Sequence, residues 1–393
     1  MVASQGFFTD GVGGVTGLQG VRMVVVSPDS KNVYTAAEGQ SAITVWSRAH
    51  DGSLKQIQVI KDKVGGVTGL NFVDNLSVSP DGKNVYAAGI TSKTFVTFAR
   101  DAAGKLTEVQ VLQNGVDVPA GLNGVIFNST SPDGKNVYAA ATLDNAIVVF
   151  SRRKFNGFLT PIQVLQNGVG GVTGLKGVFP VIVSRDGKNV YAGARTDHTV
   201  LVYSRASNGK LTLIQTLTEG VGTAKGIDGA RFIAESFEGD TIYVAGLAHN
   251  TIAVLHRDST GKLTEIQSIV WKVNATGLAT PVALVETFDH QHLIAAAFGS
   301  FGLATFHRDR TTGKLTTQED DIEDPGDGTL GLLQVISAAM SAGGQNLYTA
   351  GYFSGTLGVW KINEKSHEPF GDPGETAESA VTPDGADDVG PPN

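Results

Sequence analysis

The run SPDGKNVYAAG at residues 79–89 is one of four near-identical segments in this chain. The others are SPDSKNVYTAA at 27–37, SPDGKNVYAAA at 131–141 and SRDGKNVYAGA at 184–194. Each segment joins an Asp-Gly or Asp-Ser turn to a short run rich in Val, Tyr and Ala, which is typical of a hairpin turn that enters a β-strand. The chain is therefore built on an internal repeat.

The tyrosine of this motif marks seven units of about 52 residues. The seven anchor positions are Tyr34, Tyr86, Tyr138, Tyr191, Tyr243, Ile294 and Tyr348. An arginine follows each of the first six anchors by 14 residues, at Arg48, Arg100, Arg152, Arg205, Arg257 and Arg308. Because the spacing is so regular, every unit is expected to adopt the same local structure.

Each unit contains four short runs with β-forming composition. In the second unit they cover residues 75–79, 84–89, 95–100 and 106–112, separated by residues that favour turns. No segment shows the apolar periodicity of a helix. The sequence predicts an all-β fold, a seven-bladed β-propeller of WD40-like repeats with four antiparallel strands in each blade.

The two ends of the repeat region complement each other. The seventh unit stops at residues 358–363 without a fourth strand, whereas GFFTDGVGGVTGL at 6–18 matches QVIKDKVGGVTGL at 58–70 and supplies an additional one. We therefore expect the N-terminal strand to complete the last blade and close the ring, which removes an exposed sheet edge. The predicted domains are a propeller over residues 1–363 and a disordered acidic tail over residues 364–393.

Composition excludes several classes of protein. The chain has no cysteine, so disulfides, thiolate catalysis and cysteine-ligated metals are absent. Residues 364–393 hold eight acidic residues and one lysine, which account for most of the net charge of −8. The near-neutral remainder has no basic stripe, so we expect no nucleic-acid partner and no membrane partner. The N-terminus lacks the pattern of a signal peptide, so we expect a cytoplasmic protein.

Glycine-rich loops connect the units. The run GVGGVTGL occurs at 11–18 and 168–175, with its core GGVTGL at 65–70. The run lacks the spacing of a phosphate-binding loop and leads into a strand instead of a helix. Its recurrence around the ring favours a structural corner, where glycine permits a positive φ.

These motifs resemble the seven-bladed β-propeller lactonase family, which includes 6-phosphogluconolactonase-like and carboxymuconate-cyclase-like proteins. The resemblance rests on SPDGKNVYAA, on strands such as IVVFSR at 147–152, and on GKLT at 104–107, 209–212, 261–264 and 313–316. It covers about residues 4–363 and implies the propeller fold. It also implies a lactonase-like hydrolase or cyclase that acts on a small anionic sugar lactone or organic acid at the mouth of the channel.

A functional site is expected where single units depart from the repeat. The position that opens each predicted first strand reads Arg22, Asp74, Ile126, Phe179, Arg231, Val282 and Ile336. Neighbouring loops add Lys225, Asp228, Asp144, Asp197, His198 and His249. The predicted substrate-binding residues are Arg22, Arg231, Asp228 and Lys225, and the predicted catalytic residues are His198, His249 and Asp74. The alternative interpretation is a set of hydrated charges that line a wet channel.

A second departure concerns glutamate and histidine in the fifth and sixth units. Glu235 and Glu286 replace residues that are mostly apolar in the other units, and the same two units carry His256 and His307 before the arginine. Strand counting predicts two structural pairs, Glu235–His256 and Glu286–His307, in which hydrogen bonds offset the burial of each carboxylate. A catalytic or metal-binding role for these pairs is the alternative.

Two functions remain open at this point. The first is the lactonase-like hydrolase, and the second is a non-catalytic propeller that binds a protein or a glycan at its rim. We expect a monomer without an organic cofactor or a metal ion. A divalent cation such as Ca²⁺ at the acidic stretch 320–327 is the open alternative.

Overall fold

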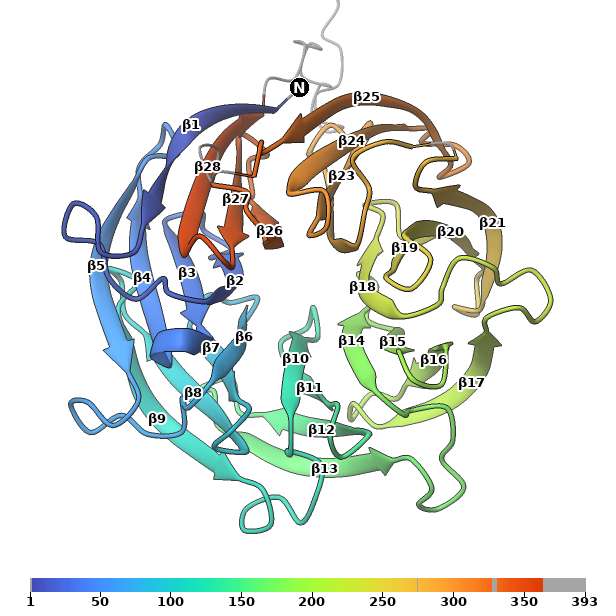
Figure 1. The fold of residues 1–393 in the computed structure, drawn as a ribbon. Helices are drawn as coiled ribbons and strands as arrows, with labels where there is room; N and C mark the ends of the chain where they lie inside the picture. The colour runs from blue at the N-terminus through green and yellow to red at the C-terminus, as the bar shows by residue number, and fades with distance from the viewer. Residues whose placement is uncertain (1, 274, 327–330, 363–393) are drawn as a thin grey trace, which may run out of the picture. The chain divides into compact units, whose positions relative to one another are not determined.

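The computed structural model describes residues 2–273, 275–326 and 331–362, except for the side chains of residues 317–320. These residues form one compact unit of 28 strands in seven four-stranded sheets, together with one short 3₁₀ helix. Figure 1 shows the sheets arranged radially, with the labelled first strands β2, β6, β10, β14, β18 and β26 nearest the central axis. The predicted seven-bladed propeller is confirmed. The predicted tail at 364–393 lies outside the described residues.

The strands follow in chain order around the ring, four to a blade. Blade one contains β2 (Val21–Val26), β3 (Asn32–Ala37), β4 (Ala42–Arg48) and β5 (Leu54–Lys61), with η1 (Glu38–Gln40) between β3 and β4. Blade two contains β6 (Val73–Val78), β7 (Asn84–Gly89), β8 (Thr94–Arg100) and β9 (Leu106–Gln113), and blade three contains β10 (Val125–Thr130), β11 (Asn136–Ala141), β12 (Ala146–Arg152) and β13 (Leu159–Gln166). Blade four contains β14 (Val178–Val183), β15 (Asn189–Ala194), β16 (Thr199–Arg205) and β17 (Leu211–Thr218).

The remaining blades have the same order. Blade five contains β18 (Ala230–Glu235), β19 (Thr241–Gly246), β20 (Thr251–Arg257) and β21 (Leu263–Val270), and blade six contains β22 (Pro281–Glu286), β23 (His292–Ala297), β24 (Gly302–Arg308) and β25 (Leu315–Glu323). Blade seven contains β26 (Val335–Met340), β27 (Asn346–Gly351) and β28 (Thr356–Ile362). Its fourth strand is β1 (Val2–Thr9), which pairs antiparallel with β28 from Val2 opposite Ile362 to Thr9 opposite Thr356. The N-terminal strand thus closes the ring, as the sequence predicts.

The hydrophobic core lies between the blades. Each hydrophobic cluster combines buried residues of two neighbouring sheets, for example Ile43 and Val45 of blade one with Val85 and Phe98 of blade two. Because the blade faces are covered by their neighbours, the second strand of a blade, such as β7, is buried on both sides and reads as a nearly continuous apolar run. The glycine-rich loops stay at the rim, where Gly13 and Gly14 both have a positive φ.

The repeated tyrosine and arginine join neighbouring blades. Arg100 Nε of blade two donates to Tyr34 Oη of blade one at 2.7 Å, and Tyr34 Oη donates to the carbonyl of Gly104 at 3.0 Å. Arg100 also binds the carboxylate of Asp29 in the blade-one turn at 2.9 Å. We call this arrangement the tyrosine–arginine bridge. The hydrogen bond between arginine and tyrosine recurs in the pairs Tyr86–Arg152, Tyr138–Arg205, Tyr191–Arg257, Tyr243–Arg308 and Tyr348–Arg48, and the carboxylate recurs in all of these except the last, where Arg48 binds Asn346.

The junction between blades six and seven has no such bridge. Ile294 replaces the tyrosine in blade six, and the strand register places Ile362 of blade seven where the other blades have arginine. Both members of the bridge are therefore absent together. This junction relies on apolar contact among residues that include Ile294, Leu347 and Ile362.

Candidate functional site

Two kinds of connection share one face of the ring, which we call the upper face. Because the strands of each blade are antiparallel, the loops between blades and the loops between second and third strands end at the same side. The hairpins that contain the SPDGKN turns lie at the opposite, lower face. Most of the predicted site residues belong to the upper face or to the start of an innermost strand.

Each innermost strand has a β-bulge at its second residue. The pairing of β2 with β3, for example, shifts between Val21 and Met23, which leaves Arg22 out of register. The same shift occurs in β6, β10, β14, β18, β22 and β26. A bulge re-aims one side chain. The seven bulge residues are therefore the residues predicted to open each first strand. Each is the second residue of its strand, as Arg22 is in β2.

The Arg22 guanidinium is neutralised by carboxylates of its own and the next blade. Its Nε donates to Glu38 Oε2 at 2.6 Å and lies 3.9 Å from Asp74 Oδ2. The guanidinium carbon lies 4.8 Å from the ring centre of Tyr352, and the Tyr352 hydroxyl donates a hydrogen bond to Glu38 Oε1 at 2.6 Å. Arg22 is thus fixed by protein groups, which leaves it less available to an anion than the sequence suggested.

Arg231 has a different environment. Its guanidinium carbon lies 3.7 Å from the ring centre of Phe179, and among the described residues it has no hydrogen bond or ion pair. Burial lowers the pKa of Arg231, while Asp74 opposes that change. Burial raises the pKa of Asp74 against the opposing effects of Arg22 and Arg231. The Asp74 carboxylate therefore interacts electrostatically with both predicted arginines, which occupy the same bulge position in their own blades.

Three further predicted residues come together between blades four and five. His198 Nδ1 forms a short hydrogen bond with Asp228 Oδ1. His249 Nε2 lies 3.6 Å from Asp228 Oδ2, and His249 Nδ1 lies 4.0 Å from Glu219 Oε1. The Asp228 carboxylate is largely buried between two imidazoles that are about half exposed. This arrangement joins a carboxylate to histidines that can exchange protons with solvent.

His198 occupies a repeat position with an unusual backbone. The residue seven positions after each anchor has a positive φ in every blade: Ser41, Lys93, Asn145, His198, Asn250, Phe301 and Gly355. Asn145 uses its side chain to accept from Gly177 N at 2.7 Å, and Asn250 accepts from Thr280 N at 2.7 Å. The ring of His198 instead contacts the Asp228 carboxylate. In blade four, this side-chain contact thus replaces the hydrogen bond that the two asparagines accept from a backbone N–H of the next blade.

His249 and Asp228 depart from the repeat as a pair. At the position of His249, blades three and four have Asp144 and Asp197, which accept hydrogen bonds from the backbone of Asn123 and Lys176. Those two backbone donors stand at the position of Asp228. Blade five therefore exchanges a backbone-capping aspartate for a histidine and places the carboxylate on the facing loop instead.

A pocket of about 270 Å³ opens beside this group. Its lining is Thr142, Gly177, Arg195, Thr196, His198, Asp228, Gly229, Leu247 and Ala248. Lys225 does not line the pocket. Its side chain is exposed, and its backbone N–H donates to Glu265 at 2.9 Å.

Sequence reasoning missed Arg195. Its guanidinium carbon lies 5.9 Å from the Phe179 ring centre, so the same ring contacts Arg231 of the channel and Arg195 of the pocket. Arg195 follows its anchor by four residues, and the other units have Glu38, Ile90, Thr142, Leu247, Phe298 and Tyr352 there. Comparing this position across the units would have identified the arginine.

The predicted pair of Glu235 and His256 does not form. Glu235 Oε2 accepts from the backbone N–H of Arg185 in blade four at 2.6 Å, and His256 is exposed. Burial raises the pKa of Glu235 to about 7, and the Arg185 N–H offsets part of that shift.

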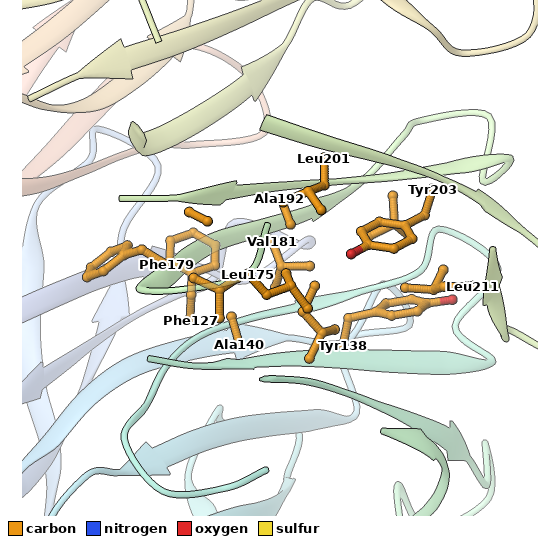
Figure 2. Packing of buried hydrophobic residues seen from close by; sticks show 14 of the residues in the cluster. Phe127, Tyr138, Ala140, Leu175, Phe179, Val181, Ala192, Leu201, Tyr203 and Leu211 are labelled. Carbon is orange, nitrogen blue, oxygen red and sulfur yellow. The ribbon is translucent and has the colours of Figure 1, made fainter. Parts of the chain in front are cut away.

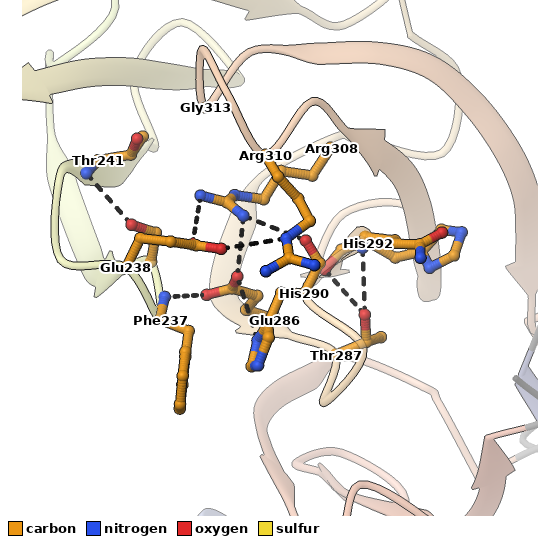
Figure 3. Close-up of polar contacts among 12 residues, drawn as sticks. Phe237, Glu238, Thr241, Glu286, Thr287, His290, His292, Arg308, Arg310 and Gly313 are labelled. Atoms are coloured by element: carbon orange, nitrogen blue, oxygen red, sulfur yellow. Dashed lines mark hydrogen bonds and ion pairs between the residues drawn. The ribbon is translucent and has the colours of Figure 1, made fainter. Parts of the chain in front are cut away.

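The predicted pair of Glu286 and His307 is also wrong. Glu286 Oε2 accepts from Phe237 N of blade five at 2.7 Å, and Glu286 Oε1 lies 3.3 Å from Arg308 (Figure 3). His307 instead forms a 3.2 Å hydrogen bond with Thr316 Oγ1. His290 stacks on Phe237, with ring centres 4.0 Å apart.

A loss of proline in the preceding blade explains why each of these positions has a glutamate. The turns of blades one to three begin Ser-Pro, and proline has no N–H, whereas Arg185 and Phe237 replace that proline in blades four and five. The turns of blades four and five therefore offer a backbone donor that the proline turns lack. The carboxylate on the next blade accepts from this donor, so these glutamates bind a neighbouring turn and no histidine.

Within the described ranges, no three His, Asp or Glu side chains gather in a way that could hold a metal ion. The acidic stretch proposed for Ca²⁺ extends beyond those ranges at Asp327. The absence of a cofactor therefore stays a prediction. None of the described helices has the length and apolar character that a membrane crossing requires.

The fold and these departures define a propeller with an asymmetric upper face, and sequence comparison assigns its family. The model of a family described as "Lactonase, 7-bladed beta-propeller" matches residues 12–164, 125–270 and 199–331. The chain therefore belongs to the seven-bladed β-propeller lactonase family.

Individual relatives are distant. A 6-phosphogluconolactonase of Erwinia tasmaniensis is 23% identical over 151 residues, which are 38% of this chain and 44% of that protein. This match thus spans less than half the length of the curated relative.

Solved structures show the same fold. The periplasmic gluconolactonase of Pseudomonas aeruginosa has a TM-score of 0.64 and 19% identity, covering 81% of this chain and 93% of that chain. The hydrazine synthase of Kuenenia stuttgartiensis also has a TM-score of 0.64, with 16% identity over 90% of this chain and 99% of that chain. Because proteins with such different names share the fold, the function must be argued from the site.

Proposed function

We propose that this chain hydrolyses a lactone that carries a carboxylate or phosphate, in the pocket between blades four and five. The hydrogen bond between His198 and Asp228 carries the proposal, because it orients an imidazole beside a cavity and next to a cationic side chain. Membership in the lactonase family and the 6-phosphogluconolactonase and gluconolactonase relatives support the same class of substrate.

The reaction follows from the orientation of His198. With Nδ1–H bonded to Asp228, Nε2 is left to accept a proton from a water molecule. The resulting hydroxide adds to the lactone carbonyl carbon, and collapse of the tetrahedral intermediate breaks the ring C–O bond. The protonated His198 returns its proton to the departing alkoxide, so the products are a hydroxyl group and a carboxylic acid, which ionises. This chemistry needs water and no organic cofactor.

The remaining charged groups suit substrate binding. Arg195 lines the pocket, and both Arg195 and Arg231 lie over the ring of Phe179, so we assign these two cations to the anionic substituent. His249 contacts the second Asp228 oxygen and supports the orientation of the carboxylate. Arg22 is held by Glu38 and Asp74 and is not assigned a binding role.

The test is a screen of carboxylated and phosphorylated sugar lactones with a pH indicator, since hydrolysis releases a proton. His198→Gln and Asp228→Asn should each lower kcat by about a hundredfold or more, as expected for loss of a general base or its orienting carboxylate. Arg195→Ala should mainly raise KM. His256→Gln is the matched control, because His256 is an exposed histidine outside the pocket.

Two results would reject the proposal. One is wild-type protein without turnover of any anionic lactone, and the other is equal turnover in the wild type and the His198 and Asp228 variants. Binding of an anion without turnover would instead favour the non-catalytic binding module.

A further inference from the structure

Phe179 is the only aromatic residue among the seven bulge residues. It is buried, with 8% of its surface exposed, in the hydrophobic cluster between blades three and four. Its ring lies at one end of that cluster beside Phe127, with ring centres 6.3 Å apart (Figure 2). The core therefore fixes the position of this ring from one side.

Two other departures in blade four accommodate Phe179. Pro180 follows it, and the pairing of β14 with β15 resumes only at Val181, although the register changes by one residue as in the other blades. Proline has no N–H for the strand ladder, so the pair that Pro180 would form with Gly193 is missing.

The partner strand provides the room. Gly193 stands where the six other blades all have alanine. A Cβ at Gly193 would lie 2.6 Å from Ala230 Cβ and 2.9 Å from Pro180 Cγ. Blade four thus lacks a methyl group that every other blade has, and this leaves room for the Pro180 ring beside Phe179.

The ring contacts two guanidinium groups. Arg231 lies 3.7 Å and Arg195 lies 5.9 Å from its centre. Neither guanidinium has a hydrogen bond or ion pair with any residue that the structure describes. The two cations repel each other, and Arg195 contributes to the lowered pKa of Arg231. Cation–π attraction to one fixed ring offsets this repulsion.

We infer that Phe179 is a positioning residue that holds Arg195 and Arg231 as a pair for one oxyanionic substituent of the ligand. The inference rests on the proposed function, because it takes the pocket between blades four and five as the substrate site. It adds which side chains select an anionic substrate. An anion bound between two unpaired guanidiniums gains charge-assisted hydrogen bonds that a neutral sugar lactone does not.

Binding of inorganic phosphate tests the inference without any turnover. Wild-type protein should bind phosphate in calorimetry or ³¹P NMR titration, and Phe179→Leu should weaken the affinity by about tenfold, because leucine keeps apolar volume but has no π face. Phe179→Tyr should restore most of the affinity. With an active lactone substrate, Phe179→Leu should raise KM and leave kcat nearly unchanged.

Phe127→Leu is the matched control. Phe127 is also 8% exposed and belongs to the same cluster, but its aromatic contacts are Phe179 and Phe232, and no guanidinium of the described residues lies over its ring. An equal effect of the two leucine variants, no effect of Phe179→Leu, or wild-type protein that does not bind phosphate would overturn the inference. If phosphate binding depends on Phe179 but no lactone is hydrolysed, the positioning role stands and the proposed function fails.

Discussion

Arg152 Nε of blade three donates to Tyr86 Oη of blade two at 2.6 Å, and the arginine side chain is completely buried. The same arginine binds Asp81 and the side chain of Asn84. Three residues of blade two, one in the turn and two in β7, therefore converge on one residue of blade three. Because the bond joins separate sheets, it contributes to the cooperativity of the ring and not to the stability of either blade alone.

Tyr86→Phe should lower the free energy of unfolding by about 1–3 kcal/mol, since it leaves a buried charged donor without its acceptor. Chemical denaturation measures this difference. Tyr203→Phe is the matched control, because the buried Tyr203 hydroxyl has no hydrogen-bond partner and its removal should cost little. Equal losses in the two variants would contradict the role of the bridge.

Arg185→Pro and Glu235→Val should be coupled in their effects on stability. Each single change leaves one half of the 2.6 Å bond between Arg185 N and Glu235 Oε2 unmatched. The double variant recreates the proline and valine found at other junctions, so its loss should be smaller than the sum of the single losses by about 1–2 kcal/mol. Glu235→Val with His256→Ser should be additive. A non-additive result for that second pair would restore the Glu235–His256 pairing rejected above.

The free energy of unfolding should decrease as the pH rises from 4.5 to about 7, the ordinary and the raised pKa of Glu286. Burial raises the pKa of Glu286 from its ordinary value of 4.5 to about 7, against the effect of Arg308. The folded protein binds more protons than the unfolded chain in this range, so the stabilisation present at low pH is lost as Glu286 ionises.

Glu286→Gln should therefore reduce the difference in unfolding free energy between about pH 5 and about pH 8. The amide oxygen can still accept from Phe237 N, which preserves the turn contact. Urea titrations at the two pH values measure the effect. An unchanged difference would show that Glu286 does not titrate in this range.

Deletion of residues 2–9 should lower the thermal unfolding temperature of the whole ring, because it removes β1 and exposes β28 as a sheet edge. It also removes the contact of Phe8 with Trp46 of blade one, whose ring centres are 5.0 Å apart. A peptide of residues 2–9 added in trans should restore part of the loss. Thermal unfolding identical to that of the full chain would rule out the closing role of β1.

The fold could be predicted because the repeat is local. Turn chemistry and strand composition lie within each unit, so motifs such as SPDGKNVYAAG indicate strands, blades and ring closure directly. The tyrosine–arginine bridge was visible only as a spacing, because its members belong to different blades. Linear distance does not show that Tyr34 contacts Arg100 instead of Arg48 of its own unit.

The candidate site was predicted in part. Departures from the repeat identified His198, Asp228 and His249, which do converge, but not Arg195, whose repeat position was not compared. The two glutamates were assigned to histidines because strands were counted within one blade. Their partner is a backbone N–H of the preceding blade, which becomes available where proline is lost, and that joint change at 185 and 235 is readable in the sequence.

The positive φ shared by Ser41, Lys93, Asn145, His198, Asn250, Phe301 and Gly355 has an evolutionary consequence. The backbone at this position is set by the ring and not by the side chain, since residues of such different chemistry adopt it. New side chains can therefore be tried at seven places on the upper face without a change of fold. Duplication of a blade multiplies these places, so a propeller can acquire an asymmetric reactive face one substitution at a time.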